Sequence, residues 1–272
     1  MVNAAKRVLV FDSGVGGLSV FDAIAASGHE LSLDYVADNA WLPYGLKSDA
    51  ALRERVPLLL ARMTEAWAPA AVVVACNTAS TIVLPDVRAA LSIPVVGVVP
   101  PIKPAAALTK TGVIGLLATP ATVQRAYTDD LIARFAADKR VVRFGSAALV
   151  EAAERKLRGE ALDPAAVHEA IDALFADNAV DVVALACTHF PLLTQELAAA
   201  APRACTWLDS GAAIARRVAD VTAATPGTAH AARAGFTDAD AARALFRAFQ
   251  ARGFSNFACI ADAPGYAITP LA

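Results

Sequence analysis

Short apolar runs alternate along the chain with longer segments in which apolar residues recur at helical spacing. The short runs are continuously apolar, which is typical of strands buried on both faces of a sheet. The predicted strands are Arg7–Phe11, Leu33–Ala37, Ala71–Ala75, Val95–Val99, Gly112–Leu117, Val141–Phe144, Asp181–Ala186, Thr206–Leu208 and Asn256–Ala261. The predicted helices are Gly17–Ala26, Asp49–Trp67, Leu84–Leu91, Thr122–Ala137, Leu149–Leu157, Pro164–Asn178, Leu192–Ala201, Gly211–Val221 and Ala239–Gln250. This alternation favours an α/β fold with mainly parallel sheets flanked by helices.

Composition narrows the class of protein. The chain has 272 residues, of which 57% are hydrophobic and 18% are charged, and this excludes an intrinsically disordered protein. The formal net charge is −2 and no basic stripe is visible, so no nucleic-acid partner is expected. The uncharged stretch Ala68–Pro85 contains several polar residues, and it predicts a buried strand followed by a polar turn rather than a membrane span. The apolar run within Met1–Val10 is too short for a signal peptide, so we expect a cytoplasmic protein without membrane association.

Two segments of the chain resemble each other. Val-Val-Val-Ala-Cys76-Asn-Thr and Val-Val-Ala-Leu-Ala-Cys187-Thr both join an apolar strand to a cysteine and a nearby hydroxyl, and the cysteines are 111 residues apart. A spacing of this size predicts two related, pseudo-symmetric α/β domains. We expect residues 1–98 and 209–272 to form the first domain and residues 99–208 the second, with prolines marking the boundary near Gly97–Pro104.

Polar residues follow several of the predicted strands directly. In parallel α/β sheets, ligands bind beyond the carboxyl ends of the strands, so these residues are candidates for a site. Two facing domains would present them to a shared interdomain cleft. The candidates are Asp12-Ser13, Asp38, Pro43-Tyr44-Gly45, Cys76-Asn77-Thr78, Thr119, Cys187-Thr188-His189 and Asp209-Ser210.

The two repeated cysteines suggest proton-transfer chemistry. A thiol can act as a base when ionised and as an acid when protonated near neutral pH. One thiolate could remove a proton from a substrate carbon while the opposing thiol delivers one to the other face, which inverts that carbon. These motifs contain no Lys or Arg, so backbone N–H groups and neutral side chains would have to hold an anionic substrate.

Other interpretations of the cysteines remain open. Cys76 and Cys187 could be buried core residues, which is the interpretation we favour for Cys205 and Cys259. Together with His189, Cys76 and Cys187 could also form an open zinc site, which metal analysis would detect.

Several motifs together resemble the glutamate racemases, a cofactor-independent family of the aspartate/glutamate racemase superfamily. They are Phe-Asp12-Ser13-Gly-Val-Gly-Gly-Leu-Ser, Tyr35-Val-Ala-Asp38, Pro43-Tyr44-Gly45, Ala-Cys76-Asn77-Thr78-Ala-Ser, Gly97-Val-Val-Pro, Gly115-Leu-Leu-Ala-Thr119 and Cys187-Thr188-His189-Phe-Pro. The chain departs from the family at Ala186, Phe190 and Ser146-Ala147, where Gly, Tyr and Cys-Pro are common.

The resemblance implies an isomerase that interconverts L- and D-glutamate without a cofactor or metal and supplies D-glutamate for peptidoglycan. It also implies a substrate site in the cleft between two α/β domains. Cys76 and Cys187 would be the two acid/base groups, and Asp12, His189 and Glu151 would assist them. The residues that would hold the substrate are Asp12, Ser13, Pro43, Tyr44, Gly45, Asn77, Thr78, Thr119, Thr188 and His189.

Two other function classes remain open. The same scaffold could catalyse another cysteine-dependent reaction, such as decarboxylation or hydantoin-type racemisation, and a substrate panel would separate these reactions. A binding protein that retains the cleft without turnover is the second alternative. The sequence also leaves the oligomeric state open, with a homodimer as one alternative.

Overall fold

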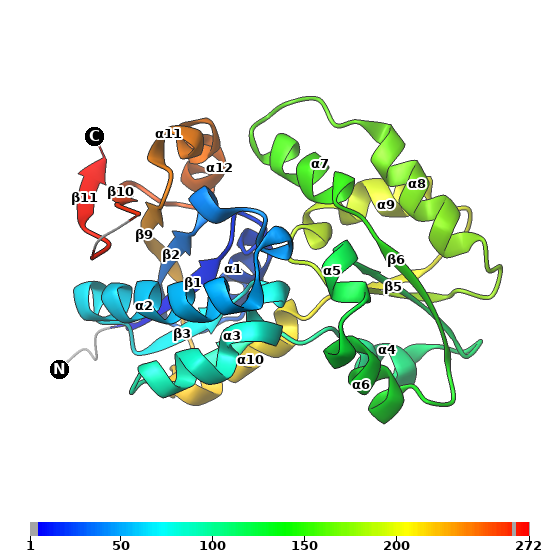
Figure 1. Cartoon of the computed structure of the whole chain (residues 1–272). Coiled ribbons are helices and arrows are strands. Elements are labelled where there is room, and N and C mark those ends of the chain that lie inside the picture. The colour runs from blue at the N-terminus through cyan, green and yellow to red at the C-terminus, as the bar shows by residue number, and fades with distance from the viewer. Residues whose placement is uncertain (1–4, 263–264, 272) are drawn as a thin grey trace. The chain divides into compact units, whose positions relative to one another are not determined.

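The computed structural model describes residues 5–262 and 265–271 and divides the chain into two compact units. The first unit contains the chain up to Val98 and from Gly211 onward, and the second contains Val99–Ser210 (Figure 1). Part of the N-terminal segment considered above, residues 1–4, lies outside the described residues.

The first unit is built on a sheet in the order β11-β10-β9-β2-β1-β3-β4. Its neighbouring strands are parallel, except that β11 runs antiparallel to β10. The strands are β1 (Lys6–Asp12), β2 (Leu31–Ala37), β3 (Ala71–Val74), β4 (Val95–Gly97), β9 (His230–Phe236), β10 (Asn256–Ile260) and β11 (Ile268–Leu271).

Helices flank this sheet. Leu9, Phe11 and Val74 point to the face covered by α2 and α3, which pack on each other. Alternate residues of a strand point to opposite faces, so Val8 and Val10 face the other layer, where α1 packs against α10. The helices and 3₁₀ turns are α1 (Leu18–Ala25), η1 (Asn39–Trp41), η2 (Tyr44–Leu46), α2 (Asp49–Trp67), α3 (Asn77–Ala90), α10 (Gly211–Thr222), α11 (Ala239–Ala242), η4 (Arg243–Leu245) and α12 (Phe246–Gln250).

The second unit has a smaller parallel sheet in the order β6-β5-β7-β8. One face packs on α7, α8 and α9, and the other packs on α4 and α6. Its elements are α4 (Ile102–Leu108), β5 (Val113–Ala118), α5 (Pro120–Val123), α6 (Ala126–Phe135), β6 (Arg140–Gly145), α7 (Ala148–Leu157), α8 (Pro164–Phe175), β7 (Val182–Leu185), η3 (Phe190–Leu193), α9 (Thr194–Ala200) and β8 (Thr206–Leu208).

The two units share a strand order. Within β1 to β4 the second strand lies beside the first, followed by the third and the fourth, and β5 to β8 repeat this arrangement. Cys76 follows β3 and Cys187 follows β7, so the two cysteines occupy equivalent positions in their sheets. The topology therefore gives a structural counterpart to the resemblance between the two sequence segments.

The predicted fold class is confirmed, since both sheets are mainly parallel and flanked by helices. Two strands and one α-helix were not expected from the sequence. β9 is rich in Ala and lacks the β-branched residues that signal a strand, and β11 carries Pro270, which an edge strand tolerates. α4 begins after Pro101, and its own Pro104 lies within the first turn, where a missing N–H costs little.

The start of α3 is a correction that matters for the site. The sequence predicted a polar turn after β3 and a helix only from Leu84, but the helix begins at Asn77. Asn77, Thr78 and Ser80 are buried in its first turns, and the Cys76 side chain caps the helix. Cys76 therefore stands at a helix N-terminus. Similarly, the single helix predicted for Thr122–Ala137 is divided into α5 and α6.

In the described part of the chain, no helix is both long enough and apolar enough to cross a membrane.

Two neighbouring leucines of α2 test the packing of the first unit. Leu60 is fully buried in the core, whereas Leu58 is 58% exposed. Leu60→Ala leaves a cavity and is expected to lower the free energy of unfolding by about 2–5 kcal/mol. The control Leu58→Ala is expected to change it by no more than about 0.5 kcal/mol. Urea denaturation followed by circular dichroism measures both, and equal effects of the two substitutions would contradict the packing described here.

Candidate functional site

Cys76 lies where the carboxyl end of β3 meets the first turn of α3. Its Sγ accepts a hydrogen bond from the backbone N–H of Ala79 at 3.5 Å, and Ser13 Oγ lies 3.5 Å from the same sulfur. The side chain is buried, with 6% of the residue exposed. A helix N-terminus presents unpaired N–H groups and favours negative charge, so this position could stabilise a thiolate.

Asp12 ends β1, the strand beside β3. Its carboxylate is fully buried and accepts a hydrogen bond from the backbone N–H of Gly14 at 2.8 Å. Tyr35 donates a hydrogen bond to the carbonyl of Gly14 at 3.0 Å and holds the loop after β1 in place. At Gly17 an added Cβ would come within 2.8 Å of both the Asp12 Cβ and the Tyr35 hydroxyl, so only glycine allows this approach. The loop therefore fixes Asp12 and Ser13 on the Cys76 side of the sheet.

Cys187 heads a buried chain of polar groups in the second unit. Its Sγ lies 3.8 Å from His189 Nδ1, and His189 Nε2 lies 2.8 Å from Glu154 Oε1 on α7. Cys187, His189 and Glu154 are all buried. A carboxylate on one ring nitrogen orients the imidazole and leaves the other nitrogen directed at the sulfur.

Burial and the neighbouring polar groups have opposite effects on the pKa of His189. Burial by itself lowers the pKa of the imidazole, but the hydrogen bonds to Cys187 and Glu154, together with their negative charge, raise it well above its ordinary value. In the protonated form, which this shift favours, both ring nitrogens are donors.

The structure corrects the expectation for Glu151. Glu154, one turn further along α7, is the glutamate that contacts His189. The Glu151 side chain is 65% exposed and accepts a hydrogen bond from Arg158 at 2.9 Å. Both glutamates lie within one turn of the same helix, so no sequence pattern separates them. Only the packing of α7 against the segment after β7 does so.

Tyr44, expected to contact substrate, is buried and directs its hydroxyl at a carboxylate. The hydroxyl donates to Asp38 Oδ2 at 2.5 Å, and Arg55 binds both oxygens of Asp38 at 2.7 Å. Burial and the neighbouring Asp38 carboxylate raise the pKa of Tyr44 well above its ordinary value, so it remains a hydrogen-bond donor. The sequence analysis did not single out Arg55. A signal existed, since Arg55 falls on the apolar face of α2 between Leu52 and Leu59.

The remaining expected substrate residues divide between the units. Asn77 and Thr78 lie in the first turn of α3, and among the described residues the buried Asn77 Oδ1 has no hydrogen-bond partner. Pro43 and Gly45 flank Tyr44 at the η2 turn. In the second unit, Thr188 is buried between Cys187 and His189, and Thr119 caps α5 at the end of β5, beside β7.

Cys205 and Cys259 lie apart from these groups. Both are free and only partly buried, so the expectation that they are core residues holds in part. Burial raises the pKa of Cys205 to about 11, which keeps it protonated. In the described part of the chain, no group of three or more His, Cys, Asp and Glu side chains could hold a metal ion.

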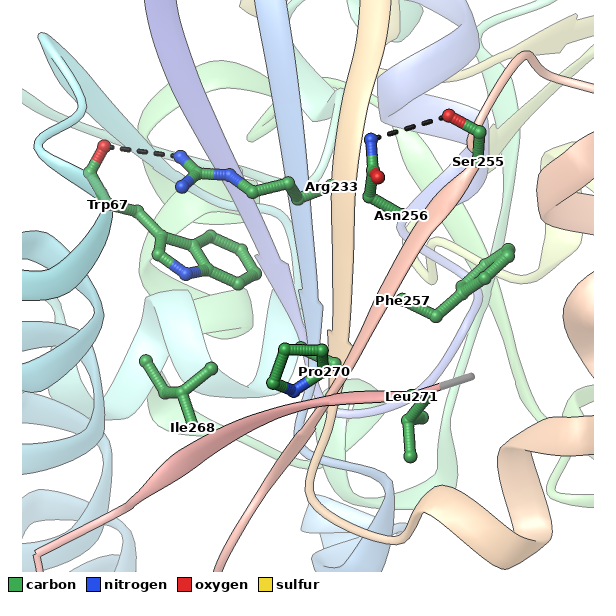
Figure 2. Close-up of a pocket in the computed structure, with 9 residues that line it drawn as sticks. Trp67, Arg233, Ser255, Asn256, Phe257, Ile268, Pro270 and Leu271 are labelled. Atoms are coloured by element: carbon green, nitrogen blue, oxygen red, sulfur yellow. Dashed lines mark hydrogen bonds between the residues drawn. The ribbon is translucent and has the colours of Figure 1, made fainter.

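Figure 2 shows a cavity of about 410 Å³ in the first unit that contains none of the expected site residues. It lies near the amino ends of β3 and β10, whereas Asp12 and Cys76 follow the carboxyl ends of their strands. Arg233 lines this cavity. Its Nη2 donates to Oδ2 of the buried Asp34 at 2.8 Å, and its guanidinium carbon lies 4.6 Å from the Trp67 ring centre. The cavity therefore belongs to a different end of the sheet from the candidate site.

Comparison with known proteins adds independent observations. Residues 18–218 match the family model described as Asp/Glu/Hydantoin racemase. The chain is 53% identical over 218 residues to the glutamate racemase of Sphingopyxis alaskensis, covering 79% of this chain and 81% of the relative. It is 51% identical over 213 residues to the glutamate racemase of Escherichia coli K12, covering 78% and 75% of the two chains.

Solved structures agree with these sequence matches. The E. coli glutamate racemase, crystallised with L-glutamate and the activator UDP-MurNAc-ala, superposes with a TM-score of 0.88 at 45% identity, covering 93% of this chain and 97% of that chain. The glutamate racemase of Thermus thermophilus, crystallised with β-chloro-D-alanine, gives a TM-score of 0.75 at 30% identity, covering 95% and 98%. The chain therefore belongs to the glutamate racemases, isomerases of the Asp/Glu/Hydantoin racemase family.

Proposed function

We propose that the protein interconverts L- and D-glutamate by moving protons between the substrate α-carbon and the thiols of Cys76 and Cys187. The observation that carries this proposal is the shared strand order of the two sheets. It gives each cysteine the same position, directly after the third strand of its repeat and at the edge where ligands bind in such folds. Two equivalent groups suit a reaction whose forward and reverse directions are chemically alike.

The reaction conserves charge and needs no redox partner. One cysteine, as thiolate, accepts the α-proton, and the electron pair of the broken C–H bond delocalises into the substrate α-carboxylate. The other cysteine, as thiol, donates its proton to the opposite face of the α-carbon. The stereocentre is inverted, and the two sulfurs exchange protonation states. This chemistry requires both thiols at one α-carbon, on opposite faces.

The groups beside each sulfur suggest their roles. Asp12 and Ser13 lie beside Cys76, where the Ser13 hydroxyl can donate to a thiolate 3.5 Å away. His189 lies 3.8 Å from Cys187, and an imidazolium held by Glu154 stabilises a thiolate by charge and by hydrogen bonding. We assign the assisting role in the second unit to the His189–Glu154 pair and not to Glu151.

Neutral donors suit the anionic substrate. Asn77, Thr78 and Thr188 are buried beside the two cysteines, together with the backbone N–H groups of the α3 N-terminus. Such groups would bind the α-carboxylate and stabilise the charge that develops on it, as in an oxyanion hole. The E. coli relative was crystallised with L-glutamate, which supports glutamate as the substrate of this chain.

Membership of the glutamate racemases points to the supply of D-glutamate for peptidoglycan. We place the protein in the cytoplasm, because the mechanism needs reduced thiols and a reducing compartment keeps cysteines free.

Solvent isotope incorporation tests the function and the two-thiol mechanism together. In D₂O and without added cofactor, L-glutamate is expected to yield D-glutamate that carries deuterium at the α-carbon, while the remaining L-glutamate stays protonated at early times. The physical reason is that different groups remove and deliver the proton. Circular dichroism follows the conversion of L- to D-glutamate, and mass spectrometry follows the deuterium content. Rapid exchange into unreacted substrate would favour a single base.

Cysteine substitutions assign the two roles. Cys76→Ser and Cys187→Ser are each expected to reduce kcat by about 10²–10⁴-fold, the usual contribution of a positioned acid or base. Cys205→Ser serves as the matched control and is expected to retain activity, since this thiol lies at the amino end of the second sheet. Full activity in both Cys76→Ser and Cys187→Ser would overturn the proposal, and a stoichiometric zinc content in the purified protein would favour the metal alternative.

The two glutamates of α7 provide a matched test of the pH dependence. Glu154→Gln removes a contact that raises the pKa of His189, so that pKa is expected to fall. A histidine with a raised folded-state pKa stabilises the protein below its unfolded pKa of about 6.5, and this contribution is lost as the pH rises through the folded-state value. Glu154→Gln is therefore expected to destabilise the protein most in mild acid, by about 1–3 kcal/mol, and least in alkali.

NMR titration of His189 and urea denaturation across pH measure these effects. The control Glu151→Gln is expected to leave the His189 pKa unchanged, because Glu151 is exposed and paired with Arg158. A larger shift from Glu151→Gln than from Glu154→Gln would show that the pairing described here is incorrect.

A further inference from the structure

A buried ion pair joins Asp38 and Arg55 near the carboxyl edge of the first unit's sheet. Arg55 Nε and Nη2 each donate to one carboxylate oxygen of Asp38 at 2.7 Å. Tyr44 donates to one of these oxygens at 2.5 Å, and Thr237 donates to the other at 2.8 Å. Asp38 is fully buried, and its two oxygens accept four hydrogen bonds.

Arg55 is enclosed on several sides. The residue is 6% exposed, and its guanidinium lies 4.3 Å from the Trp41 ring centre and 5.6 Å from that of Tyr266. It also forms an ion pair with Asp262, in the segment after β10. Transfer of these charges out of water is costly, and it is offset only if geometry and hydrogen bonds are good. Hydrophobic residues could fill this volume without the cost of removing charges from water. The presence of the ion pair therefore suggests a role beyond packing.

The pair connects parts of the chain that carry the candidate site. The backbone N–H of Asp38 donates to the carbonyl of Asp12 at 2.9 Å, which fixes the end of β2 against the end of β1. Through Asp38, Arg55 also holds the Tyr44 hydroxyl, and Tyr44 packs in the same core cluster as Cys76. A displacement of Asp38 would therefore reach both Asp12 and the Tyr44 turn.

We propose that Arg55 is a positioning residue for racemisation, which clamps Asp38 so that the Pro43-Tyr44-Gly45 turn is held against the Cys76 end of α3. Arg55 itself does not contact substrate in this scheme, and the inference rests on the proposed function. The guanidinium is suited to the task because its planar fork fixes both oxygens of Asp38 at once, whereas an ammonium group contacts a carboxylate as a point charge.

Two arginines of α2 allow a matched test. Arg55→Lys keeps the charge but loses the fork, and it is expected to lower kcat/KM for glutamate by about 10- to 100-fold, with most of the loss in KM. Arg53→Lys is the control. Arg53 lies on the same helix as Arg55 and forms an exposed ion pair with Asp86 of α3 at 2.9 Å, and its substitution is expected to leave both constants unchanged.

A second readout separates positioning from general destabilisation. The alkylation rates of Cys76 and Cys187 by iodoacetamide are measured by mass spectrometry in wild type and in Arg55→Lys, alongside Tm. A positioning role predicts a severalfold change at Cys76, no change at Cys187, and folded protein at the assay temperature. Tyr44→Phe keeps the ring but loses the hydroxyl bonded to Asp38. The ratio of the Cys76 alkylation rate to the Cys187 alkylation rate is expected to change in the same direction in Tyr44→Phe as in Arg55→Lys.

The outcomes are distinguishable. Unchanged constants and an unchanged Cys76 rate in Arg55→Lys would overturn the inference, and so would equal changes at both cysteines that follow a loss of Tm. If the wild type fails to racemise glutamate, the proposed function fails instead. In that case the alkylation ratio still reports whether Arg55 positions the Cys76 end of the sheet.

Discussion

Parallel strands bring all their carboxyl ends to one edge of a sheet, and the positions of the two candidate cysteines and of Asp12 depend on that constraint. In the order second, first, third, fourth, the first and third strands are neighbours, although the chain between them makes the second strand and its connections. Asp12 and Cys76 therefore lie beside each other despite their separation in sequence. The second unit repeats the arrangement with Thr119 and Cys187. The chain reaches two similar half-sites by forming the same topology twice.

The groups that contact the cysteine sulfur differ between the two half-sites. Cys76 accepts a hydrogen bond from a backbone N–H of a helix N-terminus and contacts a serine hydroxyl, and both partners are neutral. Cys187 lies beside His189, which contacts the buried Glu154. The second arrangement responds to pH through His189, whose pKa is raised by the contacts with Cys187 and Glu154. The two candidate acid/base cysteines are therefore surrounded by groups of different chemistry.

Buried charge is concentrated where the site has to be rigid. The Asp38–Arg55 pair and the His189–Glu154 pair each lie beside a candidate acid/base segment, and in each pair one partner comes from a helix and the other from the segment after a strand. Such pairs contribute little net stability, but breaking one leaves an unpaired charge in the core. They therefore restrict the positions of the strand ends more strictly than apolar contacts would, which suits groups that must meet a substrate carbon from defined directions.

The sequence by itself determined the α/β class, the repeat and the cysteine motifs, because periodic apolar runs and local motifs are properties of neighbouring residues. It left out β9, which is rich in Ala, and β11 and α4, each of which contains a proline. These elements form because they pair in the first sheet or pack against the second. It also placed the start of α3 too late, so the capping position of Cys76 was not foreseen. Only the tertiary structure decided between Glu151 and Glu154 and brought Arg55 to Asp38, because a helix turn offers several side chains and packing selects the one that becomes buried.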